Sequence, residues 1–411
     1  MYIRFLCGGK NRMDGIKISF KINEMPCYAI SHKNGRKTFE MQAFDGQINC
    51  DIQYDYNRRP LGLVSSVKIG DFIDVIIYPH RIELYVNGLL EDEEWPLGAR
   101  FFELGDEIRS DLEIKSEKCV EPKPNDDIII STFENAEGWR PSEKVFVGDC
   151  MPYTKDGVYH VLYLKDRHHH TSKWNLGGHQ WEHISTKDFV TWNVHPTAVP
   201  IEDPEEGSFC TGSWFEDNGV QYLYYTMRLR PGVPRSVHRS ISKDGYHYVK
   251  DKNFSFTLSD KYSTPTLRDP KVVKDKDGIY HIFLTTRLVK EKRGCIAHYV
   301  SKDMETWTDS GNPIYIAPDN TEPECPDYIE YNGKYYLIFS LNGKAQYLVS
   351  DRPFDGWKVP ENPDVPCESV PKGAVWNGEI VFTGFKRIGG YAGDMTFKTA
   401  YSDENGQLIF K

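Results

Sequence analysis

The chain has 411 residues, of which 39% are hydrophobic and 27% are charged, and its formal net charge is −10 at pH 7. This length and composition are ordinary for a globular protein of two or three domains with a sizeable core. A negative net charge without any run of basic residues argues against nucleic acid and anionic membrane surfaces as partners. It favours a neutral substrate or a protein partner.

Nine cysteines are scattered along the chain without CxxC spacing. This pattern favours reduced, structural thiols over disulfides. The opening MYIRFLCGGKNRMDG has no apolar segment of signal-peptide length, and no later run approaches the length of a membrane span. We therefore expect a cytoplasmic protein without membrane contact.

Residues 1–120 carry closely spaced strand and hairpin signals, among them GIKISFKI, CYAISHKNGRKTFEMQAF, QINCDIQYDY and DFIDVIIYPHRIELYVNG. Short strands at this spacing predict a β-sandwich domain. The run RIELYVNG resembles a stretch of the concanavalin-like and laminin-G-like sandwiches. The charged segment 115–127, KSEKCVEPKPNDD, holds two prolines and is the predicted linker to a second domain at 121–411.

From residue 150 onward, one unit recurs five times. Each repeat has an Asn-Gly or Asp-Gly pair followed at once by an apolar or aromatic strand, namely VYHVLYL, VQYLYYTM, IYHIFLTT, KYYLIFSL and EIVFTGF. Such pairs are the strongest short-range signal for a β-hairpin, because both turn positions need a positive φ. Repeats of several strands without helical periodicity predict a β-propeller in which each repeat forms one blade. The chain is thus predicted to be all-β, a five-bladed β-propeller preceded by a β-sandwich, with a single large sandwich as the alternative.

The innermost strand of each blade lines the channel of a propeller, so equivalent positions of the repeats should converge on one pocket. Counting back eight or nine residues from each hairpin glycine gives these positions for the first four repeats: Asp149, Thr211, Asp269 and Glu324. Three carboxylates at a pocket for a neutral ligand favour glycoside hydrolysis, in which one is the nucleophile or base and another is the acid. The alternative is that each carboxylate caps a turn or pairs with a neighbouring cation.

Several strings at these positions resemble the motifs of glycoside hydrolase family 32, the invertases, levanases and inulinases. They are RDPKV at 268–272, ECPDY at 324–328, the TGS of 211–213 and HQWEHISTKDFVTWNVHPTAV at 179–199. The resemblance covers about residues 140–411 and implies a five-bladed propeller and a retaining double displacement on a fructose-containing furanoside. It puts Asp149 at the nucleophile, Glu324 at the acid/base and Asp269 at the residue that stabilises the transition state.

Further residues around these three are expected to contact the substrate. The resemblance implies hydroxyl contacts for Arg268 and places the 179–183 stretch at the sugar, and Glu322 is expected at the leaving group. The segment 165–174, KDRHHHTSKW, is expected at the rim of the pocket. The complete set of expected substrate contacts is Arg268, Asp166, His179, Trp181, Thr211, Ser213 and Glu322.

Two other functions remain open: a family 43-like arabinofuranosidase or xylosidase, and a non-catalytic carbohydrate-binding protein. No cofactor is expected. The three consecutive histidines at 168–170 do not predict a metal site, because adjacent side chains of an extended segment point alternately and cannot easily chelate one ion. The expected partner is an oligosaccharide substrate, and the residues leave open whether the chain forms a homo-oligomer.

Overall fold

The computed structural model describes residues 14–34, 37–53, 61–78, 81–94, 109–122, 126–167, 178–202, 206–228 and 235–411. Within these ranges the regular structure is β-strand apart from one 3₁₀ turn at Thr264–Thr266, which confirms the all-β prediction. The chain divides into two compact units. The first is Met1–Pro124 with Thr171–Gly178 and Ile201–Ser208, and the second is Asn125–His170, His179–Pro200 and Phe209–Lys411.

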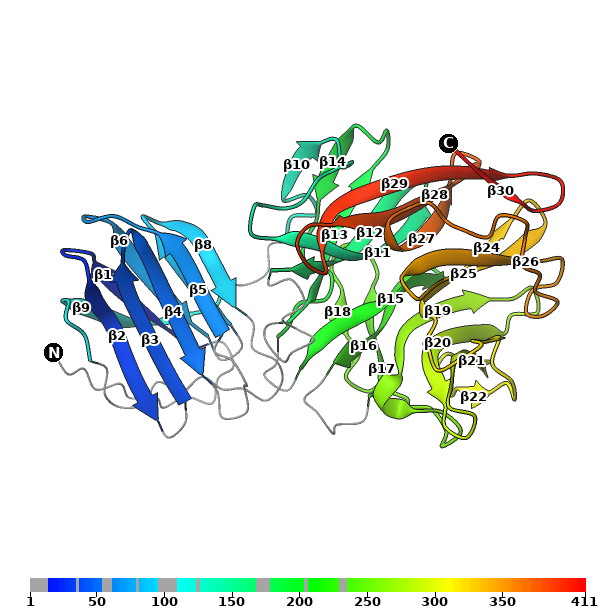
Figure 1. Ribbon diagram of the computed structural model, residues 1–411, viewed down its shortest axis with the longest axis horizontal. Helices are drawn as coiled ribbons and strands as arrows, with labels where there is room; N and C mark the ends of the chain where they lie inside the picture. The colour runs from blue at the N-terminus through cyan, green and yellow to red at the C-terminus, as the bar shows by residue number, and fades with distance from the viewer. Residues whose placement is uncertain are drawn as a thin grey trace. The chain divides into compact units, whose positions relative to one another are not determined.

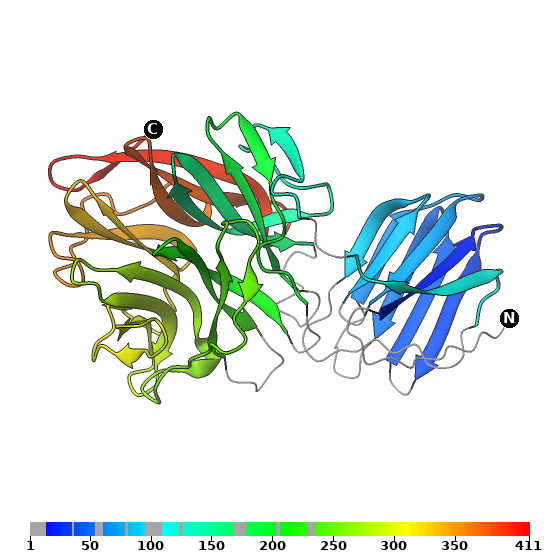
Figure 2. The same cartoon turned by 180° about the vertical axis from the view of Figure 1, so that it is seen from behind.

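The first unit holds two antiparallel sheets, with strand orders β8-β7-β6-β1-β9 and β2-β3-β4-β5 (Figures 1 and 2). One buried apolar cluster contains residues of both sheets, such as Phe20 and Val75 from one and Phe39 and Met41 from the other. Two sheets that share a core face to face form a β-sandwich. The strands are β1 Asp14–Lys21, β2 Cys27–Asn34, β3 Lys37–Phe44, β4 Gln47–Gln53, β5 Leu61–Ser66, β6 Phe72–Ile77, β7 Ile82–Val86, β8 Leu89–Glu94 and β9 Ile114–Val120.

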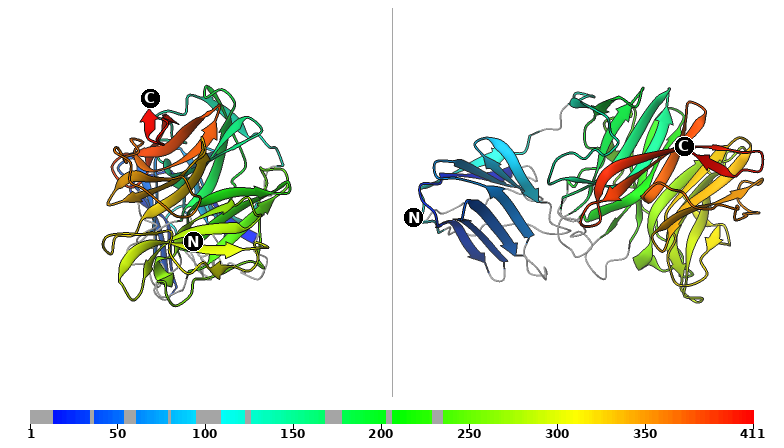
Figure 3. Two further views of the ribbon diagram at one scale, coloured as in Figure 1. Left: turned by 90° about the vertical axis from the view of Figure 1, so that its right-hand side faces the viewer. Right: turned by 45° about the horizontal axis from the view of Figure 1, so that its top comes forward.

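The second unit contains five up-and-down antiparallel groups of strands, the blades of the predicted propeller (Figures 1 and 3). Blade 1 is β11 Phe146–Lys155, β12 Val158–Asp166, β13 Gln180–Thr186 and β14 Thr191–Val194, with β10 Ser131–Glu134 at its edge. Blade 2 is β15 Ser208–Asp217, β16 Val220–Arg228, β17 Val237–Ser242 and β18 Val249–Lys250. Blade 3 is β19 Arg268–Lys274, β20 Tyr280–Leu288, β21 Arg293–Ser301, β22 Thr308–Asp309 and β23 Tyr315–Ile316.

Blade 4 is β24 Glu324–Tyr331, β25 Lys334–Leu341 and β26 Lys344–Ser350, and blade 5 is β27 Ser369–Trp376, β28 Glu379–Arg387, β29 Gly393–Ser402 and β30 Leu408–Phe410. The first and last blades join in one nine-stranded sheet, because β29 pairs with β11. The inner strands also contact one another in turn, β19 with β24, β24 with β27 and β27 with β11. The predicted five-bladed propeller with a preceding sandwich is therefore confirmed.

The hairpins of four blades are the two-residue turns that the sequence predicts. Both turn residues have a positive φ in Asp156-Gly157, Asn218-Gly219, Asn332-Gly333 and Asn377-Gly378. Blade 3 is different, since Lys274 pairs with Tyr280 and leaves a five-residue turn. The side chain of Asp275 organises that turn by accepting the N–H groups of Asp277 and Ile279, at 2.9 and 2.8 Å.

A two-residue bulge interrupts the inner strands of four blades at one position of the ladder. The bulges lie between Val147 and Cys150, Arg268 and Lys271, Glu324 and Asp327, and Ser369 and Lys372. The ladder therefore equates Arg268 with Glu324. The equivalence of Asp269 and Glu324 inferred from the hairpin glycines is wrong by one residue, because the turn of blade 3 is longer than that of blade 4.

The part of the chain that the structure describes contains no helix long and apolar enough to cross a membrane. Eight cysteines fall within it, and all eight are free thiols.

Candidate active site

The three carboxylates predicted as catalytic lie around the bulges at one end of the inner strands. The backbone N–H of Cys325 donates to Asp269 Oδ2 at 2.9 Å, and Cys325 Sγ lies 3.5 Å from Asp149 Oδ2. Cys325 directly follows Glu324 and has a φ of 52°, so the bulge of β24 turns its first residue toward both aspartates. The structure thus brings Asp149, Asp269 and Glu324 together from blades 1, 3 and 4.

Asp269 is the most deeply buried of the three, with 4% of its side chain exposed. Burial raises the pKa of its carboxyl, and the charge of Asp149 raises it further, while the Arg268 guanidinium opposes both effects. Arg268 Nε lies 3.5 Å from Asp269 Oδ2. Asp269 also has a positive φ of 57° at the first position of its bulge. The arginine and the bulge together hold this carboxylate in place.

Two hydroxyl groups fix the orientation of Asp149. Thr211 Oγ1 donates to Asp149 Oδ2, and the Tyr391 hydroxyl donates to Asp149 Oδ1. The backbone N–H of Asp149 donates in turn to the Tyr391 hydroxyl oxygen at 3.2 Å. Burial and the neighbouring Asp149 charge raise the pKa of Tyr391 well above its usual value, so its hydroxyl stays protonated as a donor. Thr211 therefore positions Asp149, and Tyr391 is a site residue that the sequence reasoning missed.

Asp166 and His179 form a buried layer behind this arrangement. Asp166 Oδ1 lies 3.1 Å from His179 Nε2, and their side chains are only 2% and 6% exposed. The His179 ring stacks on Tyr391 with centroids 5.5 Å apart. The prediction that Asp166 lies at the rim is wrong, because β12 carries it into the interior, where it orients His179. The neighbouring histidines at 168–170 lie outside the described residues.

Glu324 and Glu322 have opposite surroundings. The side chain of Glu324 is 47% exposed and its Oε1 lies 3.2 Å from Arg268 Nη2. Glu322 is only 13% exposed, and its two oxygens pair with Arg268 Nη1 at 2.5 Å and with Arg287 Nη2 at 2.7 Å. Glu322 is thus saturated by two guanidinium groups and holds Arg268 in place, whereas Glu324 faces the open side.

Trp181 does not contact a substrate, contrary to the prediction. Its side chain is 0% exposed, and its indole N–H donates to the carbonyl of Cys210 at 3.0 Å. It packs against Gly212, where an added Cβ would lie 2.8 Å from the Trp181 ring and 1.9 Å from the Tyr224 carbonyl oxygen. The alternation along β13 places Trp181 in the core that supports the neighbouring Thr211.

Ser213 faces a different part of the channel from the carboxylates, contrary to its predicted place at the sugar. Its Oγ accepts the backbone N–H of Val272 at 3.1 Å, and it lines a cavity of about 370 Å³. This cavity is bounded by inner-strand residues from the bulges to the hairpins, and none of the three carboxylates lines it. Its lining comes from all five inner strands: residues 151–153, 212–215, 271–274, 327–330 and 372–375.

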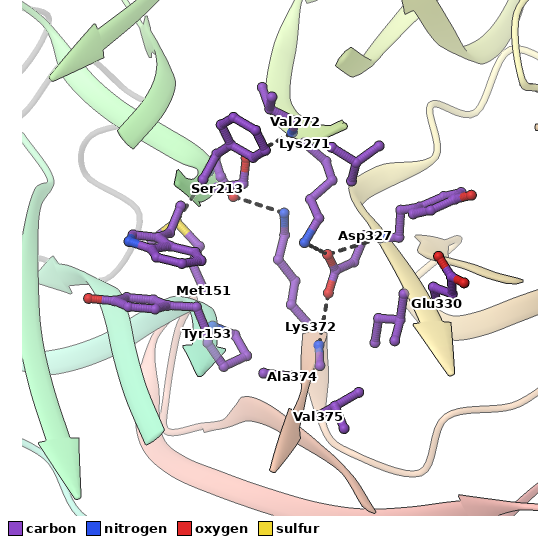
Figure 4. Close-up of a pocket in the computed structure, with 18 of the residues that line it drawn as sticks. Met151, Tyr153, Ser213, Lys271, Val272, Asp327, Glu330, Lys372, Ala374 and Val375 are labelled. Carbon is purple, nitrogen blue, oxygen red and sulfur yellow. Dashed lines mark hydrogen bonds and ion pairs between the residues drawn. The ribbon is translucent and has the colours of Figure 1, made fainter. Parts of the chain in front are cut away.

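Buried charges occupy the centre of this cavity (Figure 4). Lys271 Nζ pairs with Asp327 Oδ1 at 2.5 Å, and the N–H of Gly373 donates to Asp327 Oδ2 at 2.9 Å. Lys372 Nζ donates to the carbonyls of Gly212 and Pro326, each at 2.9 Å. Burial lowers the pKa of Lys372. These groups tie the inner strands of blades 2 to 5 together below the carboxylates.

Comparison with known proteins supports the resemblance of the motifs. The family model described as the glycosyl hydrolases family 32 N-terminal domain matches residues 149–359, about half of the chain. The chain is similar to a sucrose-6-phosphate hydrolase of Vibrio alginolyticus, with 27% identity over 207 residues, which are 47% of this chain and 40% of that protein. The chain therefore spans less than half the length of this curated relative.

Solved structures share the fold. A fructan 1-exohydrolase IIa from Cichorium intybus has a TM-score of 0.55 at 19% identity, over 68% of this chain and 60% of that one. A sucrose-6-phosphate hydrolase from Lactobacillus gasseri has a TM-score of 0.52 at 19% identity, over 65% of this chain and 62% of that one. With its propeller, its cluster of three carboxylates and the family match that begins at Asp149, the chain belongs to glycosyl hydrolase family 32.

Proposed function

We propose that this protein is a retaining glycoside hydrolase that acts on a furanoside, specifically a fructose-containing oligosaccharide. The observation that carries the proposal is the cluster of Asp149, Asp269 and Glu324 around Cys325 and Arg268. Membership of family 32 supports the same reaction. The names of the relatives, sucrose-6-phosphate hydrolase and fructan exohydrolase, support a fructosyl substrate.

In the proposed mechanism, Asp149 attacks the anomeric carbon while Glu324 protonates the leaving oxygen, and Glu324 then deprotonates the water that releases the sugar. The hydroxyls of Thr211 and Tyr391 hold both oxygens of Asp149. They keep the carboxylate aimed and stabilise it when it leaves in the second step. The exposure of Glu324 gives it access to both the leaving group and water.

Asp269 and Arg268 are proposed to bind hydroxyl groups of the fructosyl ring. Asp269 Oδ2 is held by the Cys325 N–H, so the proposal assigns its other oxygen to the sugar. A buried carboxylate that binds hydroxyls more tightly as positive charge develops on the ring stabilises the transition state. Glu322 and Arg287 would then act through Arg268, by fixing the guanidinium.

The decisive experiment is hydrolysis of a panel of fructosides, arabinofuranosides and xylosides in the presence of methanol, with identification of the methyl glycoside formed. Retention on β-fructosides would give the methyl β-fructofuranoside. The inverted methyl glycoside would contradict the assignment of Asp149 as nucleophile. Activity confined to arabinosides or xylosides would favour the family 43-like alternative, and binding without hydrolysis across the panel would favour a carbohydrate-binding protein.

Three further expectations from the sequence stay predictions. They are the cytoplasmic localisation, the domain boundary at about residue 120 and the possibility of a homo-oligomer.

A further inference from the structure

Three buried histidines gather in blade 1, away from the residues of the proposed reaction. His160 lies on β12, His183 on β13, and His195 directly follows β14, with side chains 5%, 0% and 2% exposed. One ring nitrogen of each lies within 4.8 Å of one from each of the others. His160 Nδ1 and His183 Nε2 are 3.0 Å apart.

The hydrogen bonds of His195 fix which of its nitrogens is an acceptor. Its Nδ1 lies 2.6 Å from the carbonyl oxygen of Ile128, which can only accept, so Nδ1 carries the hydrogen. Its Nε2 therefore presents a lone pair, and Ser185 Oγ lies 2.7 Å from it. A histidine that ligates a metal usually donates its other N–H to a carbonyl or a carboxylate in this way.

His183 is short of hydrogen-bond partners for a side chain with no exposure. Its Nε2 lies between His160 Nδ1 and the Tyr153 hydroxyl, at 3.0 and 3.2 Å. Its Nδ1 is buried without a hydrogen-bond partner among the described residues. An ion bound to Nε2 would leave this Nδ1 unpaired, so the nitrogen that His183 offers to a metal in this cluster is the Nε2 that faces His160.

Blade 3 offers an internal comparison. His281 and His298 occupy the same ladder positions as His160 and His183, and their rings are also joined, Nδ1 to Nε2, at 2.8 Å. There the second nitrogen of His281 binds Asp275 Oδ2 at 3.1 Å. No third histidine joins that pair within the described ranges. A hydrogen-bonded histidine pair is thus part of the repeat, whereas the third histidine is particular to blade 1.

We propose that His160, His183 and His195 form a binding site for a transition-metal ion, with Zn²⁺ as the ion that three imidazoles and a closed, buried geometry suit best. Tetrahedral Zn²⁺ with bonds of about 2.0–2.1 Å separates its nitrogen ligands by about 3.3 Å. His160 Nδ1 and His183 Nε2 are 3.0 Å apart, so these two nitrogens would have to move apart by only a few tenths of an ångström. The Ser185 or Tyr153 hydroxyl would take the fourth position.

The three proposed ligands come from separate segments of one blade. His160 lies on β12, His183 on β13 and His195 directly after β14. The ion would connect β12, β13 and the segment after β14, and its role would be to stabilise blade 1.

The test is Zn²⁺ titration of the full, untagged chain after removal of metal with a chelator, followed by calorimetry. The background protein carries Gln at 168–170, so that the consecutive histidines of KDRHHHTSKW do not contribute. We expect one Zn²⁺ per chain. In this background His195→Gln should weaken binding more than about 100-fold, beyond the about 10- to 100-fold loss typical when only a residue supporting a ligand is removed.

His298→Gln is the matched control, because it changes the equivalent histidine pair of blade 3 and should leave Zn²⁺ binding unchanged. Absence of stoichiometric binding in the background protein, or equal binding by the His195→Gln variant, would overturn the proposal. Since a buried substitution can disturb folding, Co²⁺ added to the background protein gives a second readout. The intense visible absorption of a tetrahedral site is expected, and its absence would also overturn the proposal.

Discussion

At the scale of single residues, the two glutamates before the Asn-Gly turn of blade 4 differ in their ion-pair partners and in their exposure to solvent. Glu322 is surrounded by Arg268 and Arg287, and its charge is used within the protein. Glu324 shares only one arginine with it and keeps half of its side chain in the open. A group that must give a proton to a leaving oxygen and then take one from water needs this access.

Glu324→Gln is therefore expected to lower the turnover of natural fructosides by about 10²- to 10⁴-fold, the usual contribution of a general acid or base. Aryl fructosides with a good leaving group need no protonation, so their first step should be nearly unaffected. Azide, which attacks without a base, should restore their turnover as fructosyl azide. Glu322→Gln is the control and should affect both substrate types alike. Equal losses on both substrate types with azide present in the Glu324→Gln variant would show that Glu324 is not the acid/base.

The buried carboxylate of Asp269 is expected to lower the stability of the fold while it supports activity. Because burial raises its pKa in the folded protein, the ionised carboxylate destabilises the fold at pH 7, and this cost disappears as the pH falls below the unfolded value of 3.8. Asp269→Asn should raise the free energy of unfolding at pH 7, with a gain that shrinks toward pH 4. Activity should fall by about 10²-fold or more. Urea unfolding of both proteins at the two pH values provides the check, and a variant less stable at pH 7 would contradict it.

At the scale of elements, the bulges decide where each carboxylate lies. Glu324 precedes its bulge, Asp269 is the first bulge residue of β19, and Asp149 is the second bulge residue of β11. Three different ladder positions thus supply one cluster. A strand without bulges would send neighbouring residues to opposite faces, whereas the positive φ of Asp269 and Cys325 bends these side chains toward each other.

The strands and four of the hairpins could be predicted from local turn chemistry, but the register between blades could not be read from the glycines. A better signal was available in the prolines. Pro270, Pro326 and Pro371 are each the second bulge residue of their strand, and proline inside a sheet is expected mainly at bulges or edges. Tyr391 had no such signal, because it lies in the connection between β28 and β29 and reaches Asp149 only through the fold.

The close contact of Gly212 with the neighbouring strand is expected to fix the position of Thr211, and a substitution at Gly212 tests this. An added Cβ would lie 1.9 Å from the Tyr224 carbonyl oxygen, on the backbone of the paired strand. Gly212→Ala should therefore destabilise blade 2 by about 1–3 kcal/mol. It should also lower activity by displacing Thr211 from Asp149. Gly62→Ala, where the nearest atom is 3.8 Å away, is the control. Unchanged stability and activity in the Gly212→Ala variant would contradict this view of the strand contact.

At the scale of the whole molecule, the propeller needs its inner strands held at a fixed spacing if residues from separate blades are to form one site. Asp327 has this task on the cavity side of the bulges. Its carboxylate pairs with Lys271 Nζ from blade 3 at 2.5 Å. It also accepts hydrogen bonds from the Gly373 N–H of blade 5 at 2.9 Å and from the Tyr328 N–H of its own blade at 3.0 Å. Only 1% of its side chain is exposed.

Asp327→Ala should consequently lower the free energy of unfolding of the propeller by about 3–5 kcal/mol, because it removes the partner of the partly buried Lys271 and the negative charge beside the buried Lys372. Glu330→Ala on the same strand is the control, since the pair of Glu330 with Lys276 is exposed and should contribute only about 0–1 kcal/mol. Tryptophan fluorescence during urea unfolding is the suitable measurement, because eight of the nine tryptophans lie between residues 139 and 376. Equal effects of the two substitutions would show that the central charges do not hold the blades together, and the positions of Asp149, Asp269 and Glu324 would then depend on the apolar packing between blades alone.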